Sequence, residues 1–433
     1  MVSDMTKDII KKLDNYCKSL SNMGYLNGSV LVANEGSILL SKGYGMANFE
    51  FEIDNSPQTI YRIGSITKQF TAAAILLLQE SNVINTNDVV SRFLHDYPRG
   101  DEITIHHLLT HTSGIPNFTS LKDYRKTMKL PMILEETIHV FKDLPLGFEP
   151  GEKFEYSNSG YSLLSYIIET VTNKTLESFL QEKIFNVLGM MNTGFDNNKT
   201  IIKNRASGYE VWGETVNAEY IDMSVPSGAG AMYSTTEDLY IWNLAMQSKK
   251  ILNKASSALM MKTNMGNYGY GVFVYEEEIN KLTRKVTGHG GGINGFLSEY
   301  RCYINEDITV IVLSNISTTQ VGKIANALAK IALKEEVGLP KLYSKIDMEL
   351  KQCERLIGDY KMENIPNTTL EVTNQLGKLY LSDNNTFKFE ICPFSHEGES
   401  MGFFTHGMQG TATFTKNEMY VELFGISEIA VKL

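Results

Sequence analysis

Hydrophobic and polar residues alternate with two different periods along the first part of the chain. Residues 1–20 place apolar side chains three or four positions apart, which predicts an amphipathic helix. From residue 28 to residue 51, apolar residues and glycines alternate with polar ones, interrupted at Asn34-Glu35-Gly36. This second pattern predicts an antiparallel hairpin that turns at those three residues.

In the middle of the chain the apolar residues recur with the period of helices. After residue 267 they recur again with the period of strands. An apolar run follows Gln69, and Ser234 with Glu237 matches a capping box at the start of another helix. These segments predict an α+β fold in which helices flank an antiparallel sheet. Further helices are expected at residues 105–110, 161–172, 176–188 and 321–334, and strands at residues 271–275, 296–304 and 308–313.

The pattern of apolar and turn residues changes at Gly338-Leu339-Pro340, which ends the last of these helices. A short charged helix is expected over residues 344–355. Short apolar runs separated by turn residues then predict a small antiparallel barrel or sandwich. We therefore divide the chain into a domain at residues 1–340 and a second domain at residues 341–433. Strands of the second domain are expected at residues 369–372, 378–381, 387–391, 412–415 and 419–423.

Composition narrows the possible functions. A chain of 433 residues exceeds one ordinary core, which agrees with two domains. The net charge of -10, without a cluster of basic and aromatic residues, argues against a nucleic-acid partner. No run reaches the roughly 18 apolar residues of a membrane span, and no secretory signal is seen, so the sequence as given predicts a cytoplasmic protein. The four cysteines lack C-x-x-C spacing, which favours reduced thiols over disulfides or a zinc site.

Ser65 and Lys68 form a Ser-x-x-Lys pair at the start of the apolar run. Residues three apart on a helix share a face, so the lysine can reach the serine hydroxyl. A serine becomes a nucleophile only when a base removes its proton, and a lysine serves as that base when burial or positive charge lowers its pKa. Taken alone, a serine cap beside a surface lysine is the plainer interpretation.

Tyr156 and Asn158 stand on a loop just before another expected helix. A tyrosine near a lysine can pass a proton from the serine to the leaving group, partly as a phenolate, and an asparagine amide can steady both the lysine and the substrate. The alternative is that Ser157 or Asn158 only caps the helix that follows.

A glycine-rich segment, Gly288 to Phe296, lies between two expected strands. Glycines on an edge strand allow a substrate to approach the backbone and pair with it. We expect the backbone N–H groups of Ser65 and Gly292 to hold the oxyanion of a tetrahedral intermediate. The alternative is a glycine-rich turn beside a packed histidine, His289.

Together these three elements resemble the serine β-lactamase and penicillin-binding-protein-like hydrolases, in the branch of class C β-lactamases, D-aminopeptidases, DD-carboxypeptidases and related esterases. The stretches 103–114 and 268–272 are also similar to that family. The resemblance covers residues 25 to about 335, and it implies an all-helical insertion in the first domain and a lipocalin-like second domain. It further implies that Ser65 is acylated, that Lys68 and Tyr156 share the proton transfers, and that substrate contacts come from Asn158, His289, Gly290 and Gly291.

One departure from the family bears on substrate choice. β-Lactamases and many transpeptidases carry Lys-Thr-Gly where this chain has His289-Gly290-Gly291. A neutral imidazole supplies no fixed charge for a carboxylate, so the motif favours a peptidase or esterase over a true β-lactamase. The resemblance implies small-molecule or short-peptide substrates, acylation by β-lactams, and no metal or other cofactor.

Other functions stay open at this stage. The chain could be a penicillin-recognising sensor or a scaffold whose barrel binds a partner, or a true β-lactamase. A third alternative is an esterase that uses Ser400 in Gly398-Glu399-Ser400-Met401-Gly402, although a nucleophile elbow requires a strand before the serine and a helix after it. His107 and His111 are four residues apart, but no third ligand accompanies them, which argues against zinc.

Overall fold

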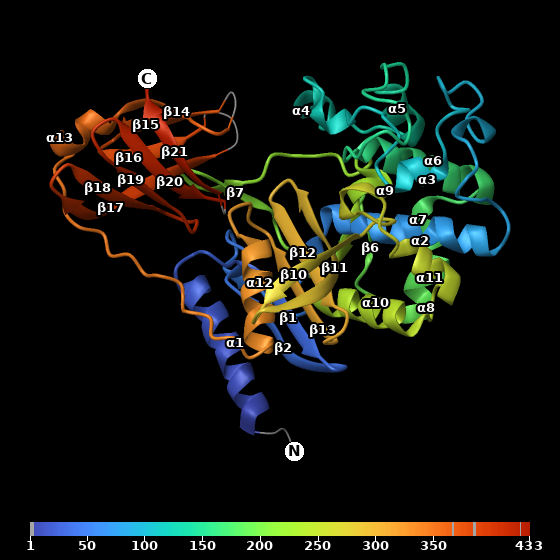
Figure 1. Ribbon diagram of the computed structural model, residues 1–433, viewed down its shortest axis with the longest axis horizontal. Helices are drawn as coiled ribbons and strands as arrows, with labels where there is room; N and C mark the ends of the chain where they lie inside the picture. The colour runs from blue at the N-terminus through green and yellow to red at the C-terminus, as the bar shows by residue number, and fades with distance from the viewer. Residues whose placement is uncertain (1–3, 366–367, 384–386, 425) are drawn as a thin grey trace.

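A six-stranded antiparallel sheet forms the centre of the first part of the molecule (Figure 1). The computed structural model describes residues 4–365, 368–383, 387–424 and 426–433. The amino-terminal hairpin pairs with the last strand of a four-stranded meander, so the two ends of this region meet in one sheet. In sheet order the strands are β10 (Phe273–Ile279), β11 (Leu282–Ile293), β12 (Phe296–Tyr303), β13 (Ile308–Ser314), β1 (Gly28–Asn34) and β2 (Ser37–Tyr44).

Helices cover both faces of this sheet, and β1 shows the consequence. Val30 and Val32 pack into a core with α1 (Asp4–Asn22) and α12 (Val321–Ala332), while Leu31 packs into the core on the opposite face. All three side chains are fully buried. A strand buried on both faces needs a continuous apolar run, which is what residues 30–33 provide.

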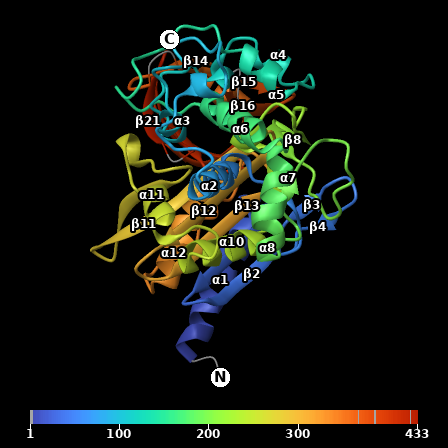
Figure 2. The same ribbon diagram turned by 90° about the vertical axis from the view of Figure 1, so that its right-hand side faces the viewer.

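Helix α2 (Thr67–Glu80) is the central element of the helical side, and Figure 2 shows it nearly end-on in front of the sheet. Its apolar residues surround it on all sides, as expected of a buried helix. The other helices of this side are α3 (Ile105–Leu109), α4 (Tyr124–Thr127), α5 (Leu134–His139), α6 (Asn158–Thr172), α7 (Leu176–Leu180), α8 (Asn186–Leu188), α9 (Ser227–Gly230), α10 (Thr236–Ser248) and α11 (Lys254–Met260).

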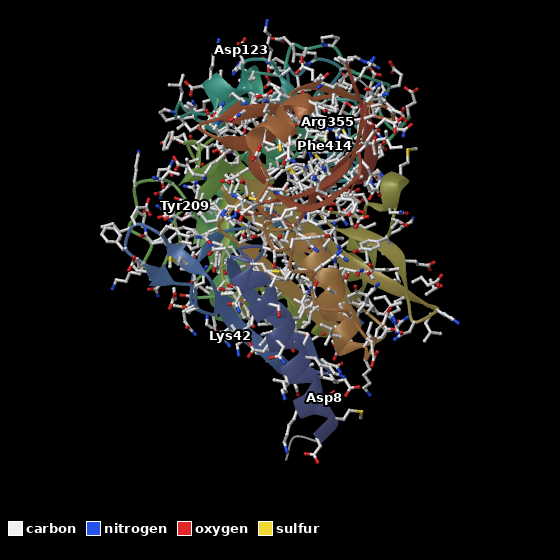
Figure 3. The ribbon with its side chains drawn as sticks, turned by 90° about the vertical axis from the view of Figure 1, so that its left-hand side faces the viewer. Asp8, Lys42, Asp123, Tyr209, Arg355 and Phe414 are labelled. Atoms are coloured by element: carbon white, nitrogen blue, oxygen red, sulfur yellow. The ribbon has the colours of Figure 1, made fainter. Side chains whose placement is uncertain are left out.

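The carboxy-terminal region is a closed antiparallel barrel, because β16 pairs with β17 as well as with β15. Phe403 and Phe414 pack in its core with side chains that are fully buried, and Figure 3 shows Phe414 within the barrel. The α+β class and the barrel expected from the sequence are confirmed. The barrel strands are β14 (Gly358–Met362), β15 (Thr369–Gln375), β16 (Lys378–Ser382), β17 (Lys388–Glu397), β18 (Ser400–Thr405), β19 (Thr411–Phe414), β20 (Glu418–Leu423) and β21 (Ile426–Lys432).

A hairpin from the first region joins the barrel sheet. Its strands are β7 (Tyr209–Trp212) and β8 (Glu214–Asn217), and the Gly213 N–H donates to the Lys388 carbonyl of β17 at 2.7 Å. Tyr209 packs in the barrel core and lies where the barrel meets the rest of the chain (Figure 3). A domain boundary at residue 340 stays a prediction, and residues 209–217 associate with the barrel although they precede it.

Smaller pairings complete the first region. Strand β9 (Met232–Ser234) pairs with both β5 (Tyr61–Arg62) and β6 (Gly194–Phe195), and β3 (Met46–Asn48) pairs with β4 (Ile53–Asp54). The four cysteines are free and buried. Within the described part of the chain, no helix combines the length and the apolar character needed to cross a bilayer.

Three helix predictions need correction. Residues 344–349 are not helical, and only α13 (Leu350–Cys353) and a 3-10 turn follow them. The Ile346 N–H donates to the Pro393 carbonyl at 2.9 Å, so this charged stretch runs along the barrel instead of coiling. A π-helical turn (Gln181–Phe185) separates α7 from α8. The helix expected from residue 161 begins earlier, at Asn158.

The expected capping box at Ser234 and Glu237 is also wrong by one position. Thr235 is the N-cap of α10, and its side chain accepts a hydrogen bond from the Asp238 N–H. The Ser234 hydroxyl bonds that of Thr193 instead, at 2.8 Å, and Glu237 accepts from the Ser41 hydroxyl.

Thr235→Ala should therefore lower the free energy of unfolding by about 1 kcal/mol, because it removes the cap of α10. Glu237→Gln is the matched control, since it alters the residue of the wrongly placed box and keeps an amide oxygen for Ser41. Urea unfolding followed by circular dichroism measures both variants. Equal losses in the two would contradict this assignment of the cap.

Candidate active site

Ser65 lies in a 3-10 turn (Gly64–Ile66) that leads from β5 into α2. The pair expected on the first turn of the helix is therefore split, because only Lys68 is within α2. Gly64 has φ +49°, and a Cβ there would approach the Gly292 nitrogen to 2.7 Å. The turn thus requires glycine, and it brings the backbone beside Ser65 against β11.

Lys68 is fully buried and its amine has three neighbours. Its Nζ lies 3.0 Å from Ser65 Oγ, 2.8 Å from Asn158 Oδ1 and 2.7 Å from the Ala229 carbonyl oxygen. The last two atoms are acceptors only, so each takes one N–H of the amine. A neutral amine has two N–H groups and one lone pair, and the lone pair then faces the Ser65 hydroxyl.

Burial lowers the pKa of Lys68 well below its usual value. Aromatic rings complete its surroundings, with the Tyr156 centroid 4.8 Å and the Tyr161 centroid 5.4 Å from Nζ. No carboxylate forms an ion pair with this amine in the described part of the chain. Burial and the lack of a carboxylate partner both shift this amine toward its neutral, proton-accepting form.

Asn158 is the first residue of α6, and its side chain is used by the site. Its Oδ1 accepts from Lys68, and its Nδ2 donates to Thr119 Oγ1 at 3.1 Å. Ser157 occupies the N-cap position, but its side chain makes no capping hydrogen bond. The alternative that these residues serve only to cap the helix does not account for the contact with Lys68.

Tyr156 holds its hydroxyl in the same buried region. That hydroxyl makes no hydrogen bond of acceptable geometry to any residue the structure describes. Burial raises the pKa of Tyr156, and the neighbouring Ser65 hydroxyl lowers it by less. The phenol is therefore the favoured form in the free protein, in contrast to the partial phenolate that the sequence suggested.

Residues 288–293 of the glycine-rich segment belong to β11, Asn294 and Gly295 form the turn that follows, and Phe296 begins β12. β10 pairs with β11 only as far as Phe273 opposite Gly288. Residues 289–293 therefore have no β10 partner and form an open edge, as the sequence suggested, although the rest of β11 is interior in the sheet. A Cβ on Gly291 would lie 2.1 Å from the Ile63 carbonyl oxygen, so this part of β11 packs closely on the chain that leads to Ser65.

His289 lies behind this open edge and is 4% exposed. Its Nδ1 lies 2.5 Å from the Gly290 carbonyl oxygen, and its Nε2 lies 3.0 Å from the Tyr268 hydroxyl. Burial lowers the pKa of His289 to about 3. The carbonyl is an acceptor, which assigns the proton to Nδ1 and leaves Nε2 to accept from Tyr268.

A pocket of about 340 Å³ opens in front of Ser65. Ser65, Asn158 and Gly292 line it, together with Thr119 and Ile293. Tyr156 and His289 do not contribute to this lining. The structure thus brings the three sequence motifs to one site, with Lys68, like Tyr156 and His289, outside the lining of the pocket.

The comparisons with known proteins agree with this arrangement. The family model described as Beta-lactamase matches residues 14–334. The chain belongs to the Beta-lactamase family. It is similar to Protein flp of Staphylococcus aureus (strain MRSA252), at 30% identity over 75% of this chain and 66% of that protein, just under two thirds of its length. It is also similar to Penicillin-binding protein 4* of Bacillus subtilis (strain 168), at 28% identity over 96% of each chain.

Solved structures extend the likeness to the whole chain. The octameric penicillin-binding protein homologue from Pyrococcus abyssi is 26% identical with a TM-score of 0.67, and the match covers 97% of this chain and 99% of that one. A D-amino acid amidase from Ochrobactrum anthropi, at 22% identity and a TM-score of 0.65 over 77% of this chain and 98% of that one, shares the fold.

Sequence reasoning missed two members of this Beta-lactamase family site. Ala229 contributes a backbone carbonyl, which no side-chain motif reveals; the signal was the run of small residues at 227–231. A Cβ on Gly228 would lie 2.3 Å from Ser165 Oγ, so that run is required for close packing. Tyr268, noted only as part of a family stretch, fixes His289.

The alternative sites are not supported by the geometry. Ser400 is the first residue of β18 and is followed by strand, so the nucleophile elbow is absent there. His111 lies beyond α3, where its Nδ1 accepts from the Ser157 N–H, whereas His107 caps α3 with Thr104. In the described ranges, no group of three or more His, Cys, Asp or Glu side chains is arranged to hold a metal ion.

The buried amine predicts how stability depends on pH. At low pH the folded protein carries the full penalty of charging Lys68. This penalty is relieved as pH rises from the folded pKa to the unfolded value of about 10.4, because the unfolded state binds more protons there. Wild-type stability should therefore rise relative to Lys68→Met between pH 7 and pH 9.5, by about 1.4 kcal/mol for each unit of pH above the folded pKa. Urea unfolding of both proteins measures the difference, in which other titrating groups cancel, and parallel curves would exclude a lowered pKa.

Proposed function

We propose that this protein is a metal-independent serine hydrolase that forms an acyl-enzyme on Ser65. The observation that carries the proposal is the placement of the Lys68 amine, whose two N–H groups are committed to Asn158 and Ala229 while Ser65 Oγ lies 3.0 Å away. This arrangement orients the lone pair of the amine at the hydroxyl, as a general base requires.

In the acylation step, Lys68 accepts the Ser65 proton while Oγ attacks the carbonyl carbon of the substrate. The N–H groups of Ser65 and Gly292 would receive the oxyanion. As the intermediate collapses, the bond to the leaving group breaks and Tyr156 gives that group its hydroxyl proton. Lys68 returns the proton it took to Tyr156. Water then attacks the acyl group by the reverse proton path, which releases the acid and restores Ser65.

The substrate class follows from the resemblance and the site together. We propose an amide or ester bond in a D-amino-acid peptide, a peptidoglycan-type peptide or a small ester. The relatives named as penicillin-binding proteins support penicillin-type recognition and acylation by β-lactams. Because His289 is neutral and both of its nitrogens are bonded inside the protein, the third motif supplies no cation for a β-lactam carboxylate. This disfavours a true β-lactamase, and we assign His289 to positioning β11.

Ser65→Ala should abolish both turnover and covalent labelling. Wild type and variant are incubated with a fluorophosphonate, a penicillin and an activated ester, and intact-protein mass spectrometry records the mass and lifetime of each adduct. Ser400→Ala is the control and should label as wild type does. Full activity of Ser65→Ala would end the proposal, and loss of activity in Ser400→Ala would favour the barrel esterase.

Adduct lifetimes separate the remaining functions. A penicillin adduct that persists while the ester turns over supports a peptidase or esterase that β-lactams inhibit. Rapid release of hydrolysed penicillin would instead support a true β-lactamase. A long-lived penicillin adduct with no turnover of any substrate would support the sensor.

Tyr156→Phe separates catalysis from folding. The hydroxyl it removes is buried without a well-formed hydrogen bond, so the free energy of unfolding should be unchanged or slightly higher. Loss of a general acid should lower kcat by about 100-fold or more. Steady-state kinetics with an amide substrate, whose leaving group needs a proton, measure the effect. An activated ester with a good leaving group is the internal control and should suffer less, whereas equal losses would argue against the acid role.

A further inference from the structure

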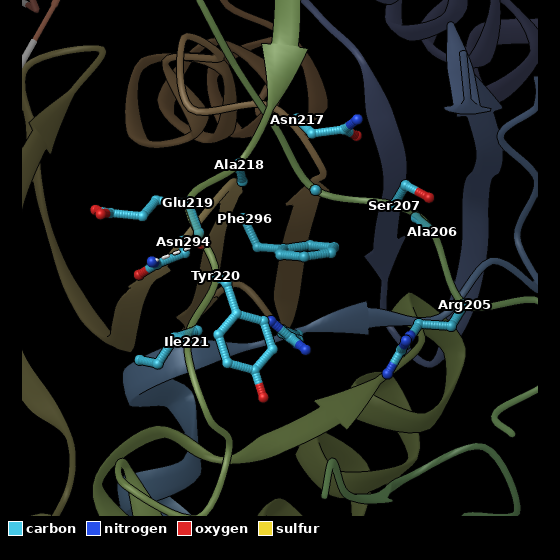
Figure 4. A pocket seen from close by; sticks show the side chains of 12 residues that line it. Arg205, Ala206, Ser207, Asn217, Ala218, Glu219, Tyr220, Ile221, Asn294 and Phe296 are labelled. Carbon is cyan, nitrogen blue, oxygen red and sulfur yellow. Dashed lines mark hydrogen bonds between the residues drawn. The ribbon is translucent and has the colours of Figure 1, made fainter. Parts of the chain in front are cut away.

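A second pocket lies beside the catalytic one and holds two arginines. It has a volume of about 260 Å³, and Ile221 and Asn294 line both pockets, so the two are contiguous. We call it the arginine pocket, after Arg62 and Arg205. Figure 4 shows Phe296 at its centre, with Tyr220 and Arg205 beside it.

The two arginines share one buried carboxylate. Arg62 Nε lies 2.8 Å and Arg205 Nη1 lies 2.7 Å from the same oxygen of Asp196. The Asp196 side chain is 0% exposed, while those of Arg62 and Arg205 are 13% and 32% exposed. One carboxylate neutralises one guanidinium, so the trio retains one positive charge.

Part of this charge remains available for a ligand. Arg62 also donates from Nη2 to Asn198, but its Nη1 has no hydrogen-bond partner among the described residues. Nε and Nη2 of Arg205 likewise have no hydrogen-bond partner among the described residues. A guanidinium edge with free N–H groups matches the two oxygens of a carboxylate.

Two further acidic residues near the pocket, Glu219 and Asp222, form no ion pair with either arginine. Glu219 lines the pocket but pairs with Lys129 at 2.6 Å. Asp222 keeps its charge, because among the described residues it accepts only from the Tyr220 hydroxyl, at 3.1 Å, and the Ser224 hydroxyl and N–H, but it does not line the pocket. Phe296 adds an apolar surface, with its ring centroid 5.7 Å from the Arg62 guanidinium carbon.

The distance to Ser65 suits a small substrate. Arg62 precedes Ser65 by three residues, so their Cα atoms are no more than about 11 Å apart. We propose that the arginine pocket binds a carboxylate of the substrate, away from the bond that Ser65 attacks. This inference rests on the proposed function and names its substrate class, namely acidic peptides or esters. It also places the recognition of negative charge away from the third motif, where the neutral His289 has both nitrogens occupied.

The test compares esters that differ only by a carboxylate at the far end of the acyl chain. Three matched pairs of p-nitrophenyl esters are used, namely hexanoate and hydrogen adipate, octanoate and hydrogen suberate, and decanoate and hydrogen sebacate. The readout is the ratio of kcat/KM within each pair, or of burst rates if deacylation is slow. In wild type, at least one pair should favour the carboxylate tenfold or more, as a charged hydrogen bond provides.

Arg205→Met should reduce that ratio at least fivefold, and Arg205→Lys should give an intermediate value because it keeps the charge but not the planar fork. Arg99→Met is the matched control. Arg99 is also partly exposed, at 38%, and pairs with Glu102 and Glu149, but it does not line this pocket. Its variant should keep the wild-type ratio.

The outcomes separate this inference from the proposed function. Ratios near one for every wild-type pair, or an unchanged ratio in Arg205→Met, would overturn the arginine pocket while Ser65 chemistry stands. An equal fall in Arg99→Met would also overturn it, because a general charge effect would then explain the preference. If no ester acylates Ser65, the proposed function fails and this inference fails with it.

Discussion

The site depends on a lysine amine that is removed from water and held by acceptors only. Two fixed oxygens, one from Asn158 and one from the backbone of Ala229, accept hydrogen bonds from Lys68 Nζ, and burial lowers the pKa of this amine. A carboxylate partner would stabilise the ammonium form and make the amine useless as a base. The protein instead surrounds the amine with buried, neutral acceptors. Folding therefore destabilises the cationic form of Lys68, and the neutral form is the one that can act as a base.

Several distant segments must meet for this arrangement to exist, and small residues allow it. Gly64, Gly228 and Gly291 each stand where a Cβ would collide with a neighbouring segment. These contacts bring β11, the turn before α2 and the segment around α9 to one place. These glycines therefore allow the backbones to approach closely. The aromatic rings around Lys68 fill the space that is left beside its amine.

The sequence predicted the general fold and the motifs better than their geometry. Apolar runs such as residues 30–33 indicate a strand that is buried on both faces, so the sheet and the helices that cover it could be predicted. The cap at Thr235 was misplaced because Ser234 and Glu237 also fit the pattern and only tertiary contacts distinguish them. The Ala229 carbonyl is a backbone group, so no pattern of side chains could predict its role. The preference for the phenol form of Tyr156 depends on burial by residues far away in the sequence, which a local reading of the chain does not give.

The hairpin of β7 and β8 connects two parts of the molecule that the chain order separates. It extends the barrel sheet at Lys388, and the residues that follow it, up to Ile221, form walls of both pockets. This segment therefore links the barrel sheet directly to the walls of both pockets, and none of its residues is among the hydrogen-bond partners of Lys68. Because the pocket wall is anchored in the barrel sheet, its sequence can vary without changing the side chains that hold the lysine.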